Sequence, residues 1–248
     1  MKGARVDEKN LLRDSLKKMK IDFDEGQLED LLKYKDLLIR TNKSVNLIGP
    51  ADSDAIIKRH ILDSLAPLSS SSGMMPGEEG ARILDIGSGG GLPGIPLAIV
   101  LKKAEVVLLE KSRKKSAFLS DVKAGLSLDN LTVLTGRAEE LAHKEIYREK
   151  FSLVTARAVT KFNILLELSI PFCNINGKII FYKSKKIFSE IDAAGEAADM
   201  LGGKIGELIE ADIPGLEGFR VLQVIDKENN TPKKFPRRFS QIKKKPLE

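Results

Sequence analysis

A glycine-rich stretch in the middle of the chain limits what the sequence can fold into. Residues 83–96 read ILDIGSGGGLPGIP, where a short apolar run containing Asp85 is followed by glycines at 87, 89, 90 and 91. A second apolar run, typical of a helix, begins close to Pro93. A strand, a glycine turn and a helix in this order form the first crossover of nucleotide-binding α/β proteins. The sequence therefore predicts such a crossover here.

The glycine spacing favours one kind of nucleotide ligand. A dinucleotide fingerprint has glycine at its first, third and sixth positions. Counted from Gly87, the third position is Gly89 but the sixth is Leu92, so NAD-dependent oxidoreduction is the weakest alternative. An acid followed by alternate glycines resembles instead the first motif of the class I S-adenosylmethionine-dependent methyltransferases. A glycine-rich turn of another α/β protein is the alternative that this stretch leaves open.

Composition restricts the cellular setting. The chain has 248 residues, enough for one domain with an additional segment. Its single cysteine, Cys173, excludes an internal disulfide and a cysteine-cluster metal site. No apolar stretch reaches the length of a membrane helix, and the N-terminal residues contain no signal-peptide core. We therefore expect a cytoplasmic, monomeric protein with no membrane association and no metal.

The positive charge is concentrated at the C-terminus. Residues 227–248 contain 8 basic and 2 acidic side chains, and their charge of +6 equals the formal charge of the whole chain. A neutral body with a basic tail favours a polyanionic partner that binds with salt-dependent affinity. We expect an extended arm that tracks the phosphates of such a partner, in which prolines prevent a long helix and Phe235 and Phe239 stack or dock. The alternative is a tail that packs against the sheet and stabilises the fold.

Three helical segments precede the glycine-rich stretch. Helices are expected at about 6–20, after a cap at Asp24, and at about 52–65. His60 and Asp63 lie three residues apart on the third of these helices, where their side chains can meet. Because no nucleophile is nearby, we interpret the pair as a structural contact or as residues that shape a substrate site.

A serine-rich linker at 69–80 divides the chain. It predicts an N-terminal helical cap at residues 1–72 and a Rossmann-like methyltransferase core at 73–226, followed by the basic tail at 227–248. Within the core, strands are expected at 82–86, 105–110, 131–135, 151–156 and 177–183, with helices at 93–102, 112–126, 160–173 and 186–201.

This alternation favours an α/β fold with a parallel sheet and right-handed crossovers. Two closing strands, expected at 204–212 and 219–226, form a hairpin that brings an antiparallel strand into the sheet. That ending resembles the class I methyltransferase architecture more than the dinucleotide-binding one.

Two further segments supply candidate ligand contacts. Glu110 ends the second strand, 23 residues after Gly87, where a carboxylate can accept hydrogen bonds from both hydroxyls of a ribose. An exposed strand-end glutamate is the alternative. After the third strand, a backbone N–H of Ala138 or Glu139 and the carboxylate of Glu139 can bind the edge of an adenine. Alternatively, the acids there only stabilise the N-terminus of a helix.

Two common methyltransferase chemistries are disfavoured. Methyltransferases that modify exocyclic amines usually carry an Asn/Asp-Pro-Pro-aromatic turn after the fourth strand, whereas this strand ends in TARAV, with Arg157 at its centre. Methylation of carbon 5 of a pyrimidine needs a cysteine nucleophile. Cys173 stands at the end of a predicted apolar helix, where a buried and inert thiol is expected.

Seven segments, in the same order and with similar spacing, resemble the RsmG (GidB) family: NLIGP, RHILDSL, DIGSGGGLPGIPLAI, LLEKSRKKSAFL, GRAEELA, TARAV and TPKKFPRR…KKKPL. The resemblance begins near Leu28 and reaches the C-terminus, although the serine-rich linker departs from the family pattern. It implies methylation of N7 of a guanine in a conserved loop of 16S ribosomal RNA, with S-adenosyl-L-methionine as donor and the RNA or the small-subunit particle as partner. It also implies donor contacts at Gly87, Leu92, Ala138, Glu139 and Arg157. Because glycine lets the backbone approach a ligand closely, we expect the donor to contact Gly89 as well as Gly87.

The chemistry that the resemblance implies needs no general base. N7 of guanine is a lone pair without a proton, so the barrier is lowered mainly by holding the methyl group and N7 in line. Side chains cannot reach N7 inside an intact A-form helix, so an accessible loop or a flipped base is required. The sequence identifies no catalytic residue. One alternative keeps the fold and is a methyltransferase for a small metabolite; the other, from another class of function, is a non-catalytic RNA- or ribosome-binding module.

Overall fold

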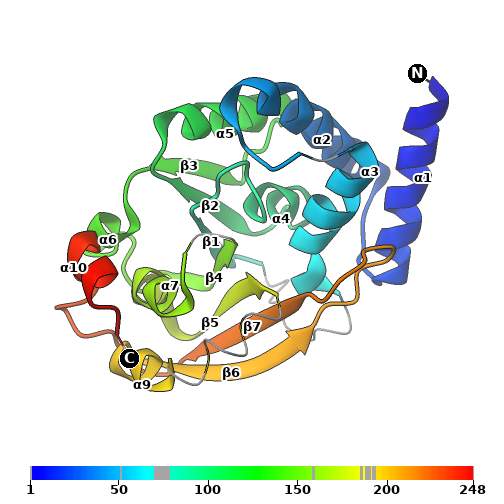
Figure 1. Cartoon of the computed structure of the whole chain (residues 1–248). Helices are drawn as coiled ribbons and strands as arrows, with labels where there is room; N and C mark the ends of the chain where they lie inside the picture. The colour runs from blue at the N-terminus through cyan, green and yellow to red at the C-terminus, as the bar shows by residue number, and fades with distance from the viewer. Residues whose placement is uncertain are drawn as a thin grey trace.

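The computed structural model describes residues 2–50, 52–69, 79–157, 160–184, 187, 191 and 194–247. Its centre is a seven-stranded sheet in the order β3-β2-β1-β4-β5-β7-β6 (Figure 1). The strands are β1 (Arg82–Ile86), β2 (Glu105–Glu110), β3 (Leu131–Thr135), β4 (Phe151–Arg157), β5 (Cys173–Lys183), β6 (Gly203–Glu210) and β7 (Val221–Lys227). The first five are parallel, and β7 runs antiparallel to both β5 and β6. The predicted parallel sheet and closing hairpin are confirmed.

Helices cover both faces of this sheet. On one face lie α1 (Lys2–Lys18), α2 (Glu25–Val45), α3 (Ser53–Ile56), the π-helix η1 (Ile57–Leu62), the 3₁₀ turn η2 (Ala66–Leu68), α4 (Gly94–Val100) and α5 (Arg113–Leu126). On the other lie α6 (Ala138–Leu141), α7 (Phe162–Ser169), the 3₁₀ turn η3 (Ile170–Phe172), α9 (Gly195–Met200) and α10 (Phe239–Lys244). Side chains alternate between the two cores along each strand, since Ile83 packs in the first and Leu84 in the second.

Helix α2 begins at the predicted cap. Asp24 accepts a hydrogen bond from the backbone N–H of Gln27 at 2.7 Å, and the Gln27 side chain accepts one from the N–H of Asp24 at 2.8 Å. This reciprocal pair satisfies two donors that a helix start leaves without partners. The Gln27 amide also donates to the carbonyls of Ile99 and Val100, at 3.1 and 2.9 Å, at the end of α4. The cap of α2 therefore also fastens this helix to the core.

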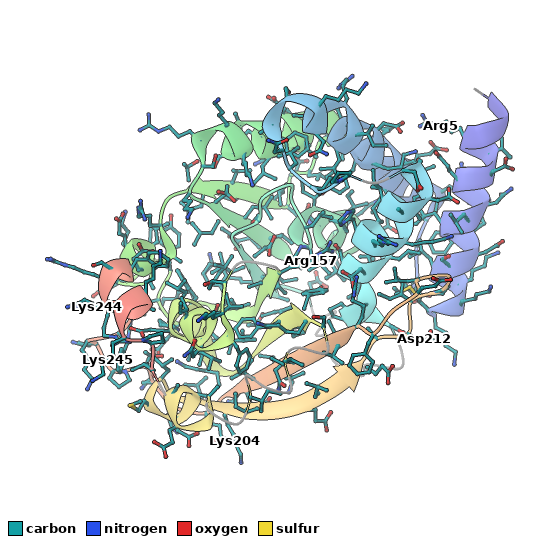
Figure 2. All side chains as sticks on the ribbon, viewed as in Figure 1. Arg5, Arg157, Lys204, Asp212, Lys244 and Lys245 are labelled. Carbon is teal, nitrogen blue, oxygen red and sulfur yellow. The ribbon has the colours of Figure 1, made fainter. Side chains whose placement is uncertain are left out.

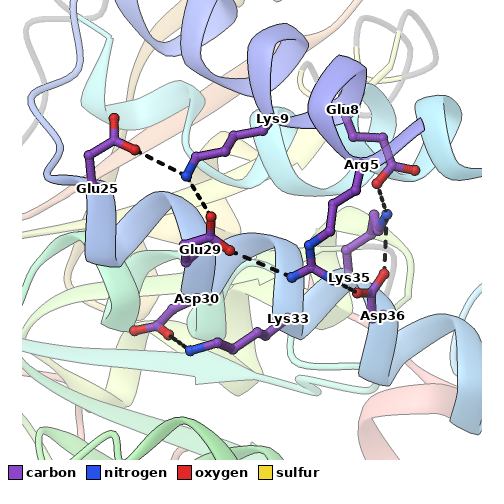
Figure 3. Close-up of polar contacts among 9 residues, drawn as sticks. All are labelled: Arg5, Glu8, Lys9, Glu25, Glu29, Asp30, Lys33, Lys35 and Asp36. Atoms are coloured by element: carbon purple, nitrogen blue, oxygen red, sulfur yellow. Dashed lines mark hydrogen bonds and ion pairs between the residues drawn. The ribbon is translucent and has the colours of Figure 1, made fainter. Parts of the chain in front are cut away.

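Helix α1 packs along α2 at the edge of the molecule. Leu12, Leu16 and Met19 are buried in the interface. Figure 3 shows the charged rim, where ion pairs join α1 to α2 through Arg5, Glu8, Lys9, Glu25, Glu29, Lys35 and Asp36. Exposed ion pairs each contribute little free energy of folding. We therefore infer that the apolar contacts hold α1 in place and that the charges fix its orientation.

The predicted domain boundaries stay predictions. Residues 70–78 of the serine-rich linker lie outside the described residues, as do 185, 186, 188–190, 192 and 193 of the helix predicted at 186–201. The cap helices and the sheet nevertheless share one apolar cluster, in which Leu38 of α2 and Ile61 of η1 accompany Ile83 of β1. Cap and core are thus joined by a common interior.

The C-terminal segment folds against the core, so the prediction of an extended arm is wrong for residues 228–247. Arg148, between α6 and β4, donates hydrogen bonds to the carbonyls of Thr231, Pro232 and Phe235 at 2.7 to 3.2 Å. Phe235 is 4% exposed and Ile242, on α10, is fully buried. The sequence showed the charge of this segment but not the partners that bind it.

Two basic residues of the predicted tail at 227–248, Lys227 at the end of β7 and Arg237, are neutralised inside the protein. The ammonium group of Lys227 is buried and contacts Glu149 at 3.2 Å. Arg237 forms an ion pair at 2.6 Å with Glu167, which is completely buried on α7. A buried carboxylate is tolerated only when it is paired and hydrogen-bonded. These pairs therefore bind the segment to the core.

Removal of residues 229–248 tests this arrangement. We expect the melting temperature to fall by roughly 10 °C, because exposing the surface that Phe235 and Ile242 cover costs roughly 3–5 kcal/mol, and each kcal/mol lowers the melting temperature by roughly 2–4 °C. Thermal unfolding followed by circular dichroism measures the change. The variant with Lys243→Ala, Lys244→Ala and Lys245→Ala is the control and should melt like the wild type, because these side chains are exposed. An unchanged melting temperature on truncation would contradict the folded tail.

Candidate functional site

A pocket of about 300 Å³ lies at the carboxyl ends of the first three strands. Five of the seven residues predicted to contact a donor line it: Gly87, Gly89, Glu110, Ala138 and Glu139. They come from the turn after β1, from the end of β2 and from the start of α6 after β3. The topology thus gathers three segments that are distant in the sequence.

The glycines of the turn serve two different purposes. Gly91 and Gly94 are needed for packing, since a Cβ atom would lie 2.3 Å from Ile95 at the first position and 2.1 Å from Leu108 at the second. Gly89 has a φ of +57°, and a Cβ there would have only the Gly87 carbonyl oxygen near it, at 3.7 Å. Gly89 therefore needs its backbone conformation and leaves open space on the pocket side.

Asp85 holds the turn and helix α4 together from below the pocket. Its carboxylate is fully buried and accepts hydrogen bonds from the N–H of Gly94 and the hydroxyl of Thr155, both at 3.2 Å. Burial raises the pKa of this carboxyl from 3.8 to about 6, although these hydrogen bonds favour the charged form. Asp85 thus positions the start of α4, and it does not line the pocket.

Glu110 lies at the centre of the pocket wall and is 6% exposed. One carboxylate oxygen accepts from the N–H of Gly89 at 2.9 Å, and the other accepts from the N–H of Ser112 at 2.7 Å. A carboxylate offers about four acceptor positions, so roughly two remain for a ligand. The alternative of an exposed strand-end glutamate is excluded by this burial.

The third segment forms the far end of the pocket. Arg137 caps α6, and Ala138 and Glu139 stand in its first turn, where backbone N–H groups have no acceptor within the helix. The carboxylate of Glu139 lies 3.6 Å from the guanidinium of Arg137, and its side chain is 11% exposed. The arrangement offers donors and an acceptor to a flat polar edge.

Several lining residues were not identified from the sequence. Lys111 and Lys115 line the pocket, as do Leu168 of α7 and Phe239 of the C-terminal segment. Lys111 follows Glu110 directly and Lys115 lies on the first turn of α5, and this closeness to Glu110 was the available signal. Nothing local in the sequence indicates that Leu168 and Phe239 reach the same site.

Leu92 and Arg157, the other two predicted contacts, lie outside the lining of this pocket. Leu92 is 8% exposed and belongs to the apolar cluster beneath the glycine turn. Arg157 points from the end of β4 toward η1, as Figure 2 shows. The structure thus gives these two residues contacts other than the expected ones.

Arg157 is the centre of a polar cluster between the sheet and the N-terminal helices. Its guanidinium forms an ion pair with Asp63 at 2.9 Å and donates to the ring Nδ1 of His60 at 2.6 Å and to the carbonyl of Arg59 at 3.1 Å. Tyr182 on β5 adds a hydrogen bond to the carbonyl of Ser64 at 2.8 Å. His60 and Asp63 thus meet at one arginine. The expectation of a structural contact agrees with this geometry.

The local backbone and charge explain this cluster. The wider turns of the π-helix carry His60, and such turns are frequent at functional sites. Burial, together with the cations of Arg157, Arg59 and Arg220, lowers the pKa of His60 to about 4. His60 is therefore neutral at pH 7, and because its Nδ1 accepts from Arg157, the proton lies on Nε2. Burial raises the pKa of Asp63, while Arg157 and Arg220 oppose that shift.

Cys173 offers no nucleophile. It is the first residue of β5 rather than the end of a helix, because it pairs with Phe151 before a shift in the strand register. The thiol is buried, and burial raises its pKa to about 12. Within the described part of the chain, no three His, Cys, Asp or Glu side chains are grouped as metal ligands, and no helix is long and apolar enough to cross a membrane.

Comparison with known proteins gives a consistent family. The family model described as rRNA small subunit methyltransferase G (GidB) matches residues 27–211. A protein named ribosomal RNA small subunit methyltransferase G from Clostridium tetani is 34% identical over 96% of this chain and 98% of its own length. Relatives of the same name from Alkaliphilus metalliredigens and Dehalococcoides mccartyi (strain BAV1) are 35% and 37% identical, over 98% and 92% of this chain and 100% and 94% of their own lengths.

Solved structures show the same fold at low identity. A variant of MtNAS in complex with S-adenosylmethionine has a TM-score of 0.54 at 16% identity, over 81% of this chain and 73% of that chain. MtNAS in complex with MTA and tNA has a TM-score of 0.53 at 16% identity, over 81% and 71% of the two chains. The class I methyltransferase architecture expected from the glycine motif and the closing hairpin is confirmed.

The lowered pKa of His60 leads to a prediction about acid stability. Because the folded pKa lies below the unfolded value of 6.5, folding favours the neutral ring, and stability is lost as the pH falls from 6.5 toward 4. The variant His60→Gln keeps an acceptor for Arg157 but cannot be protonated. Urea unfolding measures the free energy of unfolding at pH 7 and at pH 5. Between these two values, the wild type should lose roughly 1–2 kcal/mol more of this free energy than the variant does. Equal losses would contradict the buried neutral histidine.

Proposed function

Because this chain belongs to the rRNA small subunit methyltransferase G (GidB) family, we propose that it transfers the methyl group of S-adenosyl-L-methionine to N7 of a specific guanine in a conserved loop of 16S ribosomal RNA. The observation that carries the donor part is the bond between the Glu110 carboxylate and the N–H of Gly89, inside a pocket at the carboxyl ends of the strands. Ligands of open α/β sheets bind at this edge.

We assign the donor contacts by the chemistry of each lining segment. The two acceptor positions left on Glu110 suit the two hydroxyls of a ribose. The N–H groups of Ala138 and Glu139 and the carboxylate of Glu139 suit the edge of an adenine. The turn at Gly87 and Gly89 then faces the methionine part, whose sulfonium group a close backbone approach accommodates.

Leu92 and Arg157 receive supporting roles in this proposal. Leu92 anchors the glycine turn in the apolar core. Arg157, at the end of β4, orders His60 and Asp63 at the side of the pocket where the transferred methyl group would lie. Thr160, three residues further on, lines the pocket itself. We therefore place the acceptor guanine beside Thr160 at the pocket, next to the cluster that Arg157 forms with η1.

The reaction needs positioning rather than proton transfer. The donor supplies an electrophilic methyl group, to which the lone pair of guanine N7 forms a bond while the carbon–sulfur bond breaks. N7 carries no proton, so a neutral His60 and a paired Asp63 are compatible with the chemistry. Holding two reactants in line accounts for a large part of such a rate enhancement.

The RNA partner is supported by the remaining charge of the C-terminal segment. Six of its cations are exposed: Lys233, Lys234, Arg238, Lys243, Lys244 and Lys245. Figure 2 labels Lys244 and Lys245 beside α10 at the edge of the molecule. Cations of this kind contact phosphates and fix the register of the RNA. We propose that the protein acts as a cytoplasmic monomer on 16S RNA or on the small-subunit particle.

The donor assignment is tested by substitution in the turn and at the ribose acceptor. Gly87→Val should abolish S-adenosylmethionine binding in isothermal titration calorimetry, because a Cβ there meets the bound donor. Glu110→Ala should weaken binding by roughly 1–3 kcal/mol. The matched control is Gly218→Val, because Gly218 also has a positive φ, of +103°, but a Cβ there would have no atom within 4 Å, and the residue does not line the pocket. Undiminished binding in folded Gly87→Val, or micromolar NADH binding to the wild type, would contradict the assignment.

The acceptor is tested by mapping methylated guanines. Mass spectrometry of small-subunit RNA from cells with and without the gene should show one N7-methylguanine that depends on the gene. The purified enzyme should restore it on RNA from the deletion strain. The variant with Lys243→Ala, Lys244→Ala and Lys245→Ala should modify the same guanine with a higher KM for RNA and a weaker dependence of KM on salt. Identical maps from the two strains would overturn the proposed acceptor.

A further inference from the structure

The C-terminal segment contributes a side chain to the candidate donor pocket. Phe239, the first residue of α10, lines the pocket together with Leu168 of α7 and Ala138 of α6. These three side chains belong to one apolar cluster with Ile164 and the fully buried Ile242. The pocket therefore has an apolar end, formed by these side chains, in addition to the polar lining from Gly89 and Glu110.

A buried ion pair fixes the position of this wall. The guanidinium of Arg237 bonds both oxygens of Glu167, at 2.9 Å through Nε and 2.6 Å through a terminal nitrogen, and the backbone N–H of Arg237 adds a bond at 2.8 Å. Glu167 precedes Leu168 on α7 and is 0% exposed. A planar two-point contact leaves little freedom of rotation. Phe239, two residues after Arg237, is thus held at a defined distance from α7.

A second contact ties the same segment to the other side of the pocket. The ring Nε2 of His143, which follows α6, hydrogen-bonds the carbonyl of Pro236 at 2.8 Å. Figure 1 shows α10 beside α6 and near α7, so the segment crosses from one helix to the other. The segment is therefore fastened on both sides of the opening that Phe239 covers.

We propose that residues 236–242 are a wall of the donor site, in which Phe239 contacts the purine ring of S-adenosylmethionine and the Glu167–Arg237 pair positions that ring contact. The inference rests on the proposed function, which puts the adenine at the Ala138–Glu139 end of the pocket. An aromatic side chain at an apolar end of the pocket suits the face of a purine, because a base stacks favourably on an aromatic ring. Glu167 and Arg237 act through Phe239 and are positioning residues.

This wall has a consequence for the basic segment. Arg238 lies between the anchor Arg237 and the pocket residue Phe239, and its own side chain is exposed. The stretch of chain that closes the donor pocket therefore also carries one of the six exposed cations. If the segment only packs against the core, a variant that still folds should bind the donor as tightly as the wild type. The affinity for the donor therefore distinguishes a packing role from a role as a wall of the pocket.

Calorimetry on variants at position 239 is the first experiment. Phe239→Ala should raise the Kd for S-adenosylmethionine about tenfold, and it should raise the Kd for adenosine by the same factor, because the lost contact is to the purine that both ligands share. Phe239→Tyr should restore wild-type affinity. The matched control is Phe235→Leu, which changes a buried aromatic ring of the same segment that does not line the pocket. It should lower the melting temperature and leave both Kd values unchanged.

A spectroscopic probe gives an independent measurement. The chain contains no tryptophan, so Phe239→Trp introduces a single fluorophore whose emission should change on titration with adenosine. Phe235→Trp should not respond. Glu167→Gln should raise the Kd in the wild-type background and have no further effect in a Phe239→Ala background, as expected for a residue that acts through Phe239.

The outcomes separate this proposal from the one on which it rests. A wild type that binds S-adenosylmethionine, with an unchanged Kd in folded Phe239→Ala and a silent fluorophore at position 239, would overturn the wall and leave the donor site intact. A wild type that binds neither S-adenosylmethionine nor adenosine would overturn the proposed function itself. An equal loss of affinity for both ligands in Phe239→Ala, with wild-type affinity in Phe239→Tyr, would support the proposed wall.

Discussion

The pocket depends on the contact between the Glu110 carboxylate and the backbone N–H of Gly89. This bond spans two neighbouring strands, because the acid ends β2 and the glycine follows β1. The second bond, from the N–H of Ser112, fixes the other carboxylate oxygen. A buried carboxylate without such donors would be costly, and a glycine turn without an anchor would be free to move. Each group thus stabilises the conformation of the other and leaves the remaining acceptor positions directed at the pocket.

A second constraint is the guanidinium of Arg157, which joins the N-terminal helices to the sheet. It neutralises the buried Asp63, and it favours the neutral state of His60 by charge repulsion as well as by its hydrogen bond. A site that transfers a methyl group to a lone pair requires no proton acceptor. The chain places a fixed cluster at the end of β4, held by the ion pair to Asp63 and the hydrogen bond to His60. This is consistent with catalysis by orientation.

Sequence patterns predicted the parts of the molecule that local rules determine. The strands β1, β2 and β3 and the cap of α2 follow from apolar periodicity and from a single capping residue, and the pocket positions of Gly87, Gly89 and Glu110 follow from where strands end. The start of β5 was missed because the residues up to Cys173 were predicted as a helix, although Cys173 pairs with Phe151 before a register shift. The contacts of Arg157 were missed because its partners are more than 90 residues away.

The C-terminal segment shows most clearly why charge alone does not determine conformation. Its prolines and lysines are typical of an extended arm, but four carbonyls and two cations of the segment find partners on Arg148, His143, Glu149 and Glu167, none of which has a local sequence signal. The apolar side chains Phe235 and Ile242 then point inward and the remaining lysines point outward. The side of the segment that faces the protein packs against the core and closes the pocket, and the side that faces solvent carries the exposed cations. Both sides belong to the same short stretch, which is already ordered when a polyanion binds to its outer side. The conformational entropy of this stretch is therefore lost when the protein folds, and it does not have to be lost again on binding.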